Sequence, residues 1–364
     1  MAPSRSGRHL RLDRDEDSLV CRIGRMARTG EFTMWKFIVK RLIQGIVIIF
    51  LGSLIIYAVI RCLPTSFVED MARQRAAQAS SVGGKSYQEW LNQLNQVYGL
   101  DRGILPGFFA WLRKAVRGDF GDSWKYNVTV TEKFHEVIGC TLYLNIVTFL
   151  LELLICIPLG ITAARKQYSR TDYAITVFAL LGISLPTFFL ATLLKYVFSV
   201  RLGWVDMYGL VGRNFYKMDA FHQLLDMGAH MLMPVVTLTI AGLGGLTRFT
   251  RTNMLEVLNA DYIRTARAKG LPESRVISRH AFRNTLIPLV TYMSYLIPSM
   301  FSGSMITEQL FQIPGIGYTS YQAIVSGDIP FTMFYSTFLL ILTQLSLLLA
   351  DIMYAVVDPR VRIH

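Results

Sequence analysis

Ionisable residues are scarce in this chain, and acidic residues are scarcer than basic ones. Only 17% of its 364 residues are charged, with 25 Asp and Glu against 37 Lys and Arg, whereas 52% are apolar. This composition excludes an ordinary soluble domain, in which about 25% of residues are charged. It predicts a membrane protein in which polar loops alternate with apolar helices.

Residues with metal-binding or catalytic chemistry are few and poorly spaced. The six His and four Cys residues show neither metal-ligand spacing nor a disulfide framework. Gly84-Lys85-Ser86 ends like a phosphate-binding loop, but Ala79 stands where the first glycine of such a loop is needed. We therefore predict no catalytic, metal or ATP site in this chain. Cys62 and Cys140 are expected on the same side of the membrane, either as a pair or as two free thiols.

Apolar runs of about 20 residues are long enough to cross a hydrocarbon layer of roughly 30 Å as helices. The sequence contains six such runs, which predict six transmembrane helices in an all-α polytopic fold. The runs lie near 42–63, 138–163, 173–199, 229–247, 285–307 and 331–356. The fourth run is rich in glycine and weak in hydropathy, so it requires close packing against neighbouring helices.

The distribution of Lys and Arg predicts the orientation of these helices, because basic residues concentrate on the cytoplasmic side. Four segments, 1–41, 164–172, 248–284 and 358–364, carry 23 of the 37 basic residues. The longer segments on the opposite side carry 13. We therefore expect both termini and the loop 248–284 to be cytoplasmic. The net charge of +12 follows from this bias, and no aromatic-basic motif indicates a nucleic-acid partner.

Two other segments stand apart from the apolar runs. Residues 1–33 are polar and lack the apolar centre of a signal peptide, so we expect a disordered N-terminal extension before a membrane domain at 34–364. The segment 64–137, between the first two runs, is too long for a simple connection and is expected to be a structured outer loop. Helical spacing over 87–98, and again before Gly118, predicts two amphipathic helices within it.

The cytoplasmic loop 248–284 is basic, and its first half predicts a short helix. Either Asn259 or Asp261 can cap that helix. Its apolar stripe has i, i+3, i+7 spacing and consists of Ile263, Ala266 and Gly270. Gly270 is expected to end the helix in a left-handed turn.

The second half of this loop predicts a second short helix. Pro272 suits its first turn, and Glu273 complements its N-terminal dipole. The helix is expected to end at Arg283-Asn284, before the next apolar run starts at Thr285. The loop therefore reads as helix, glycine, helix, held at the membrane surface by basic residues.

Two runs in this loop resemble the cytoplasmic loop of ABC-importer permeases, most closely those of the dipeptide and oligopeptide branch. The runs are Ala266–Leu271 and Arg279–Pro288. The general family loop reads Glu-Ala-Ala, three residues, Gly, and this chain retains only the second Ala and the Gly, a departure that also resembles the peptide branch. Four further segments match the first of that branch's two permease subunits in family order, from about Met34 to Arg362: Gly99–Asp101, Gly118–Ser123, Ile313–Gly317, and Asp351–Tyr354 with Asp358–Arg360.

The resemblance implies a permease subunit that forms half of a pathway for uptake of di- and oligopeptides, in a prokaryotic inner or plasma membrane. A homologous second permease would form the other half, and an extracytoplasmic substrate-binding protein would deliver the peptide. Two ABC ATPase subunits would bind ATP and Mg, so this subunit would need no cofactor and would meet only membrane lipid besides these partners. In the family the cytoplasmic loop docks in an ATPase cleft as a pair of coupling helices. The residues this assigns to coupling are Ile263, Ala266, Lys269, Gly270, Leu271 and Arg279.

Charged residues inside the predicted spans are functional candidates, because a charge in lipid costs several kcal/mol. Glu152 lies near the middle of the second span and is the candidate for the pore; an interhelical brace is its alternative role. Lys195 and Glu308 are expected to reach the outer interface, and Asp351 to brace the inner end of the last span.

Other functions also remain as alternatives. Nickel and oligosaccharide permeases share much of this pattern. An ion-coupled secondary transporter would be built from inverted repeats, which are not evident here.

Overall fold

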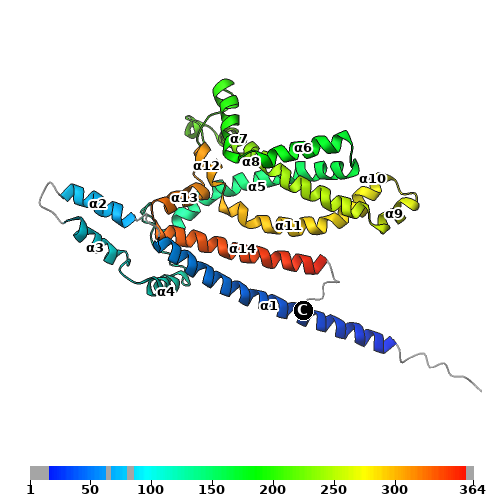
Figure 1. The fold of residues 1–364 in the computed structure, drawn as a ribbon, viewed down its shortest axis with the longest axis horizontal. Helices are drawn as coiled ribbons and strands as arrows, with labels where there is room; N and C mark the ends of the chain where they lie inside the picture. The colour runs from blue at the N-terminus through cyan, green and yellow to red at the C-terminus, as the bar shows by residue number, and fades with distance from the viewer. Residues whose placement is uncertain (1–15, 63–66, 80–85, 358–364) are drawn as a thin grey trace, which may run out of the picture.

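A computed structural model describes residues 16–62, 67–79 and 86–357 of the chain (Figure 1). Within these ranges the regular elements are all helices, and the one β contact is an isolated bridge between Asp122 and Thr129. The all-α expectation is therefore confirmed. The long helices are α1 (Glu16–Cys62), α5 (Val130–Arg165), α8 (Ala220–Leu258), α11 (Arg283–Ser302) and α14 (Ile329–Val357).

Five helical segments of the described chain are long and apolar enough to cross a membrane, and a sixth candidate is broken. The broken candidate comprises α6 (Arg170–Ser184) and the segment Thr187–Arg201, which meet at 99°. The segment after the bend holds α7 (Thr187–Leu194) and the π-helix η1 (Lys195–Arg201). The predicted span near 173–199 is therefore present only as two helical segments joined at a sharp bend.

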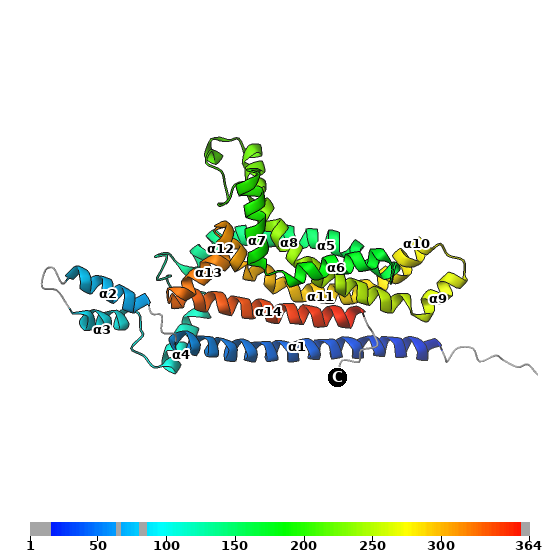
Figure 2. The ribbon, with the colours of Figure 1, turned by 45° about the horizontal axis from the view of Figure 1, so that its top comes forward.

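Pro186 explains this break. It lacks the N–H that a continuing helix needs, and it disfavours helical backbone at the residue before it. Leu185 accordingly has φ −84° and ψ 124°, an extended conformation. From this bend the segment projects sideways from the bundle, together with the 3₁₀ turn η2 (Phe215–Lys217) and the start of α8 (Figure 2).

The long helices lie side by side with most of the short ones gathered at the two ends of the bundle (Figures 1 and 2). One end, called the α9 end, holds α9 (Asp261–Ala268) and α10 (Glu273–Arg275). The other, called the α13 end, holds α12 (Met305–Phe311), α13 (Ile316–Val325) and the helices α2 to α4. The polar features of the chain thus separate into two regions far apart along the bundle.

Close contacts at glycines explain the weakly apolar fourth run. A Cβ at Gly244 of α8 would lie 2.3 Å from the Ala179 carbonyl oxygen of α6, and one at Gly182 would lie 2.5 Å from that of Ile240. A Cβ at Gly160 of α5 would lie 2.6 Å from the Thr250 Cβ. Small residues therefore let the backbone of α8 pack closely against α5 and α6. This close packing stabilises α8 in the bundle although its hydropathy is low.

The segment between the first two spans is structured, as expected. It forms α2 (Phe67–Ala79), α3 (Tyr87–Val97) and α4 (Ile104–Ala115). Ser86 and Glu89 close a reciprocal capping box at the start of α3, and Gly118 follows α4 with φ +81°. Both amphipathic helices predicted in this segment are therefore present.

The predicted N-terminal extension is described only in part. Residues 16–33 belong to α1 and continue into its first apolar turns, in place of the disordered segment expected there. Residues 1–15 lie outside the described residues.

Candidate functional site

The basic loop at the α9 end folds as a short helix, a glycine turn and a second helical segment. α9 begins after Ala260, whose backbone is extended and whose side chain provides no cap. Neither residue predicted to cap it does so: Asp261 is its first helical residue, and the Asn259 side chain donates to the Leu255 carbonyl of α8 at 3.0 Å. α9 therefore starts directly from the end of α8 through a turn of two residues.

The apolar stripe of α9 faces the bundle. Ile263 is fully buried and Ala266 is 6% exposed. They pack in a cluster contributed by α5, α8 and the second helical segment: Ala164, Met254, Leu258, Val276, Ile277 and Ala281. The expectation that this stripe enters a partner's cleft is therefore wrong for these two residues, because the chain covers them itself.

The second helical segment of the loop does not stop before the next span. α10 passes into the π-helix η3 (Val276–Phe282), which continues into α11 at Arg283 without a break. The predicted boundary at Arg283-Asn284 is wrong because no proline or glycine interrupts the backbone there. α10 is thus joined to the membrane-spanning part of α11 by one continuous run of helical residues.

Gly270 and one ion pair define the turn between the two helices. Gly270 has φ +73°, as expected for a glycine that ends a helix in a left-handed turn. Across this turn Arg267 donates to both carboxylate oxygens of Glu273, at 3.1 and 2.8 Å. Both side chains are about half exposed, so the ion pair contributes little to the free energy of folding. Its main effect is to hold the conformation of the turn.

Besides its buried stripe, this loop has an exposed face. The residues of this face are exposed and lie away from the bundle. They are Tyr262, Thr265, Ala268, Lys269, Gly270 and Arg279. Leu271 is partly buried and packs against the inner cluster. Of the residues predicted for coupling, Lys269, Gly270 and Arg279 are thus accessible to a partner, whereas Ile263 and Ala266 support them from beneath. Tyr262, which is 47% exposed, was missed because an aromatic residue at a helix start resembles a packing residue.

A buried ion pair joins the α9 end of α8 to the start of α6. Arg251 donates to the two carboxylate oxygens of Asp172 at 2.7 and 2.8 Å, and Asp172 is 3% exposed. Asp172 also accepts from the Tyr168 backbone N–H at 3.0 Å. The sequence did not reveal this pair, because its members are 79 residues apart.

The predictions for the other charged residues in or near the spans have different outcomes. Asp351 pairs with Arg41 of α1 at 3.0 Å, so its predicted role at the end of the last span is supported. Lys195 and Glu308 are buried, at 8% and 0% exposure, and the expectation that they reach an interface is wrong. Lys195 donates to the Leu310 carbonyl at 2.6 Å, and its Nζ lies 3.8 Å from the centre of the Tyr208 ring.

Glu308 is held between α5, α12 and the start of α13. Its carboxylate accepts from the Thr141 hydroxyl at 2.9 Å and from the Tyr318 backbone N–H at 2.8 Å. A Cβ at Gly315 would lie 2.4 Å from one of its oxygens, so the glycines of Ile313–Gly317 leave room for this carboxylate. The function of that motif in the fold is therefore to enclose Glu308.

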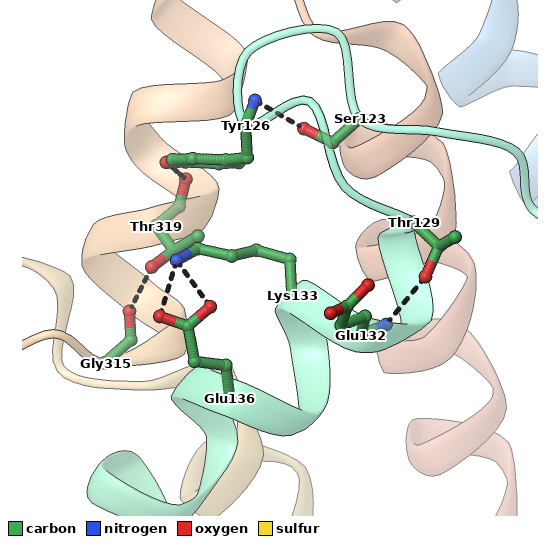
Figure 3. A network of polar contacts seen from close by, with 8 residues as sticks. All are labelled: Ser123, Tyr126, Thr129, Glu132, Lys133, Glu136, Gly315 and Thr319. Atoms are coloured by element: carbon green, nitrogen blue, oxygen red, sulfur yellow. Dashed lines mark hydrogen bonds and ion pairs between the residues drawn. The ribbon is translucent and has the colours of Figure 1, made fainter.

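A second polar network ties the segment before α5 to α13 (Figure 3). The Tyr126 hydroxyl donates to the Thr319 carbonyl at 3.1 Å, and the Ser123 hydroxyl donates to the buried carboxylate of Asp328. Beside them Lys133 pairs with Glu136 at 2.9 Å. The segment Gly118–Ser123, singled out in the sequence, is thereby fixed against the α13 end of the bundle.

Glu152 lies on α5 against α8. Its Oε1 occupies the space beside Gly242, where a Cβ would come within 1.8 Å of it. Its carboxylate has no hydrogen-bond partner in the part of the chain that the structure describes. The structure therefore shows no hydrogen bond that would make Glu152 an interhelical brace, and its role in the pore stays a prediction.

Glu152→Gln tests this prediction. We expect transport to fall about threefold to tenfold with complex yield unchanged, because the amide removes a charge without removing a structural hydrogen bond. Uptake by proteoliposomes, normalised to the amount of assembled complex, measures both quantities. A loss of yield with normal transport per complex would show instead that Glu152 is a brace, and no change in either would exclude both roles.

Cys62 and Cys140 are both free thiols in the structure. Among the described residues no group of three or more His, Cys, Asp or Glu side chains is arranged to hold a metal ion. The polar sites described above are contacts within the chain and one exposed face of the loop at the α9 end.

These features define a class: a multi-pass helical membrane protein with a structured surface loop at one end and a polar network at the other. Residues 156–363 match the family model described as "Binding-protein-dependent transport system inner membrane component". The chain belongs to this family, whose members are permease subunits and not themselves catalytic.

Several curated relatives resemble the chain along nearly all of their length. The oligopeptide transport system permease protein AppB of Bacillus subtilis is 35% identical over 331 residues, which cover 90% of this chain and 99% of the relative. The oligopeptide transport system permease protein OppB of Salmonella typhimurium is 32% identical over 332 residues, covering 90% and 100%. OppB of Haemophilus influenzae is 30% identical over 331 residues, covering 90% and 100%.

Proposed function

We propose that this chain forms half of the pathway of an ATP-driven importer of di- and oligopeptides. The relatives named as oligopeptide permeases support the substrate class. The observation that carries the transport mechanism is the exposed face of α9 and its turn, at the end of a helix bundle and supported by a buried cluster beneath it. A surface of this kind fits a partner that pushes or pulls on the bundle.

The proposed importer requires further subunits besides this chain. A homologous second permease completes the pathway, and two ABC ATPase subunits bind ATP and Mg and contact the exposed face of α9. An extracytoplasmic binding protein delivers the peptide at the α13 end. This subunit itself holds no cofactor.

The buried cluster gives the coupling step a physical route. α9 and η3 share one core with Ala164 of α5 and with Met254 and Leu258 of α8, so these elements move together. α10 is continuous with α11 through η3. Closure of the ATPase pair on ATP would therefore rotate α5, α8 and α11 as a connected group, which changes the side to which the pathway opens.

The substrate class is tested by uptake. The reconstituted complex should accumulate radiolabelled tripeptide and pentapeptide in an ATP-dependent manner when the binding protein is present. Uptake of nickel or of an oligosaccharide in place of peptide would support the alternative permeases of the same branch. Uptake driven by an ion gradient without ATP would indicate a secondary transporter.

Orientation is the second testable part of the proposal, with the α9 end and both termini in the cytoplasm. In a background with both Cys62→Ser and Cys140→Ser, Gln167→Cys and Ser274→Cys should resist an impermeant thiol reagent in intact cells, whereas Asn92→Cys should react. All three positions are exposed. Ser123 is unsuitable as an outer reporter because it is 1% exposed. Labelling of position 274 from outside would reverse the proposed orientation.

A further inference from the structure

A cavity of about 550 Å³ opens at the α13 end, beside the helices that precede the second span. It is bounded by the last turns of α1, the loop between α3 and α4, α4 itself, the segment 119–124 and the start of α14. Its volume lies in the range of ligand sites. None of the residues predicted for coupling or for the pore contributes to it.

An arginine at the end of α1 is held in place beside this cavity. The Arg61 Nη2 donates to the backbone carbonyls of Leu100 and Arg102, at 2.8 and 2.9 Å. Its guanidinium also lies 6.0 Å from the centre of the Tyr57 ring. These contacts fix the guanidinium before any partner arrives, which lowers the entropy cost of binding to it.

Two N–H donors of the lining lack acceptors. Arg61 Nη1 and Trp111 Nε1 are buried and have no hydrogen-bond partner among the described residues. A buried donor without an acceptor costs about 1–3 kcal/mol. Both side chains border the cavity, so two N–H groups of its wall are left unpaired within the described chain.

The charges that face the cavity favour an anionic acceptor. Three cations line it, Arg61, Arg102 and Lys114, against two carboxylates, Asp119 and Asp122. One oxygen of Asp119 already accepts from the Gly121 backbone N–H at 3.0 Å. The aromatic side chains of Tyr98, Trp111 and Trp124 form part of the wall. A carboxylate on an apolar stem matches this combination of cationic and aromatic surface.

We propose that this cavity receives an acidic side chain of the extracytoplasmic binding protein. A protein partner is favoured over a small anion because apolar side chains beside the cavity are exposed: Val97 of the lining is 71% exposed, and Val116, which lies two residues after Lys114 and outside the lining, is 79% exposed. The family description itself names a binding-protein-dependent system. This inference rests on the proposed function, because it assigns the docking position of that importer's binding protein.

The test uses the assembled complex in lipid nanodiscs and the purified binding protein that stimulates its ATP hydrolysis. Lys114→Glu should weaken binding of that protein about tenfold or more by surface plasmon resonance, through repulsion of the entering carboxylate. Arg113→Glu makes the same charge change at the preceding, exposed residue of α4, which does not line the cavity, and should change binding less than twofold. Trp111→Phe keeps an aromatic side chain but removes the indole N–H and part of the packing against Phe108, so it should weaken binding about threefold, and its melting temperature is measured to account for the lost packing.

The outcomes separate this inference from the proposed function. If no binding protein stimulates the wild-type complex, the proposed function fails. If stimulation is normal but Lys114→Glu and Arg113→Glu behave alike, the cavity is not the docking position and the inference fails alone. Saturable binding of free glutamate to the wild-type complex, abolished by Lys114→Glu, would overturn the choice of a protein partner in favour of a small carboxylate.

Discussion

Ala268→Arg is expected to reduce binding-protein-stimulated ATP hydrolysis and peptide uptake at least tenfold. Ala268 is the last residue of α9 and is exposed on the face away from the bundle. A long charged side chain there would obstruct the contact with an ATPase subunit, and a tenfold loss corresponds to about 1.4 kcal/mol of docking free energy. ATP hydrolysis, uptake and retention of the ATPase subunits during purification are the measurements.

Two comparison variants show whether the loss is specific. Gln74→Arg adds the same side chain at an exposed position of α2, at the opposite end of the molecule, and should leave all three quantities unchanged. Ala266→Arg should also abolish activity, but by disrupting the buried cluster, so its complex yield should fall as well. Full activity of Ala268→Arg would contradict the role of this face in coupling.

Glu308→Ala is expected to destabilise the assembled complex by about 3 kcal/mol or more. The substitution leaves the Thr141 hydroxyl and the Tyr318 N–H without their acceptor, and each buried orphan costs about 1–3 kcal/mol. The cavity left by the side chain adds to this cost. Thermal unfolding of the purified complex in detergent measures it.

Glu136→Ala is the matched control for this substitution. It removes a carboxylate whose side chain is 63% exposed and which pairs with Lys133 (Figure 3). Exposed pairs of this type contribute less than about 1 kcal/mol. Equal melting temperatures for the two variants would show that Glu308 does not hold α12 and α13 together.

The same carboxyl should make stability depend on pH. Burial raises the pKa of Glu308 above its usual value of 4.5, although the hydrogen bonds it accepts oppose the shift. α12 lies outside the candidate spans. Because the folded protein binds this proton more tightly than the unfolded chain, the stabilisation is complete below pH 4.5 and is lost as the pH rises through the raised pKa. Glu308→Gln has no proton to lose, so its unfolding should lack this component.

Local sequence patterns predicted helix boundaries well where residues close in the sequence determine them. Ser86 with Glu89 closes the start of α3, and Gly270 ends the turn after α9, because capping and left-handed backbone depend on neighbouring residues. The break at Pro186 has an equally local cause. Hydropathy over 173–199 is continuous across the proline, so run length alone does not show this break.

Helix ends and facing directions were less predictable. The periodicity of Ile263 and Ala266 identified an apolar stripe, but periodicity does not say whether that stripe meets the chain's own core or a partner. The structure turns it inward, onto Met254 and Val276. The exposed face of α9 follows only from that packing.

The sequence by itself determined that this protein is an all-α membrane protein with a basic loop and a structured segment before the second span. Composition, run length and short-range spacing carry that information, since each depends on residues close together in the chain. Only the tertiary structure decided which polar groups meet. Thr141 with Glu308, Ser123 with Asp328 and Arg251 with Asp172 join residues 167, 205 and 79 positions apart. The physical reason is that a buried charge selects its partner by proximity in the folded bundle, and that proximity leaves no short-range pattern in the sequence.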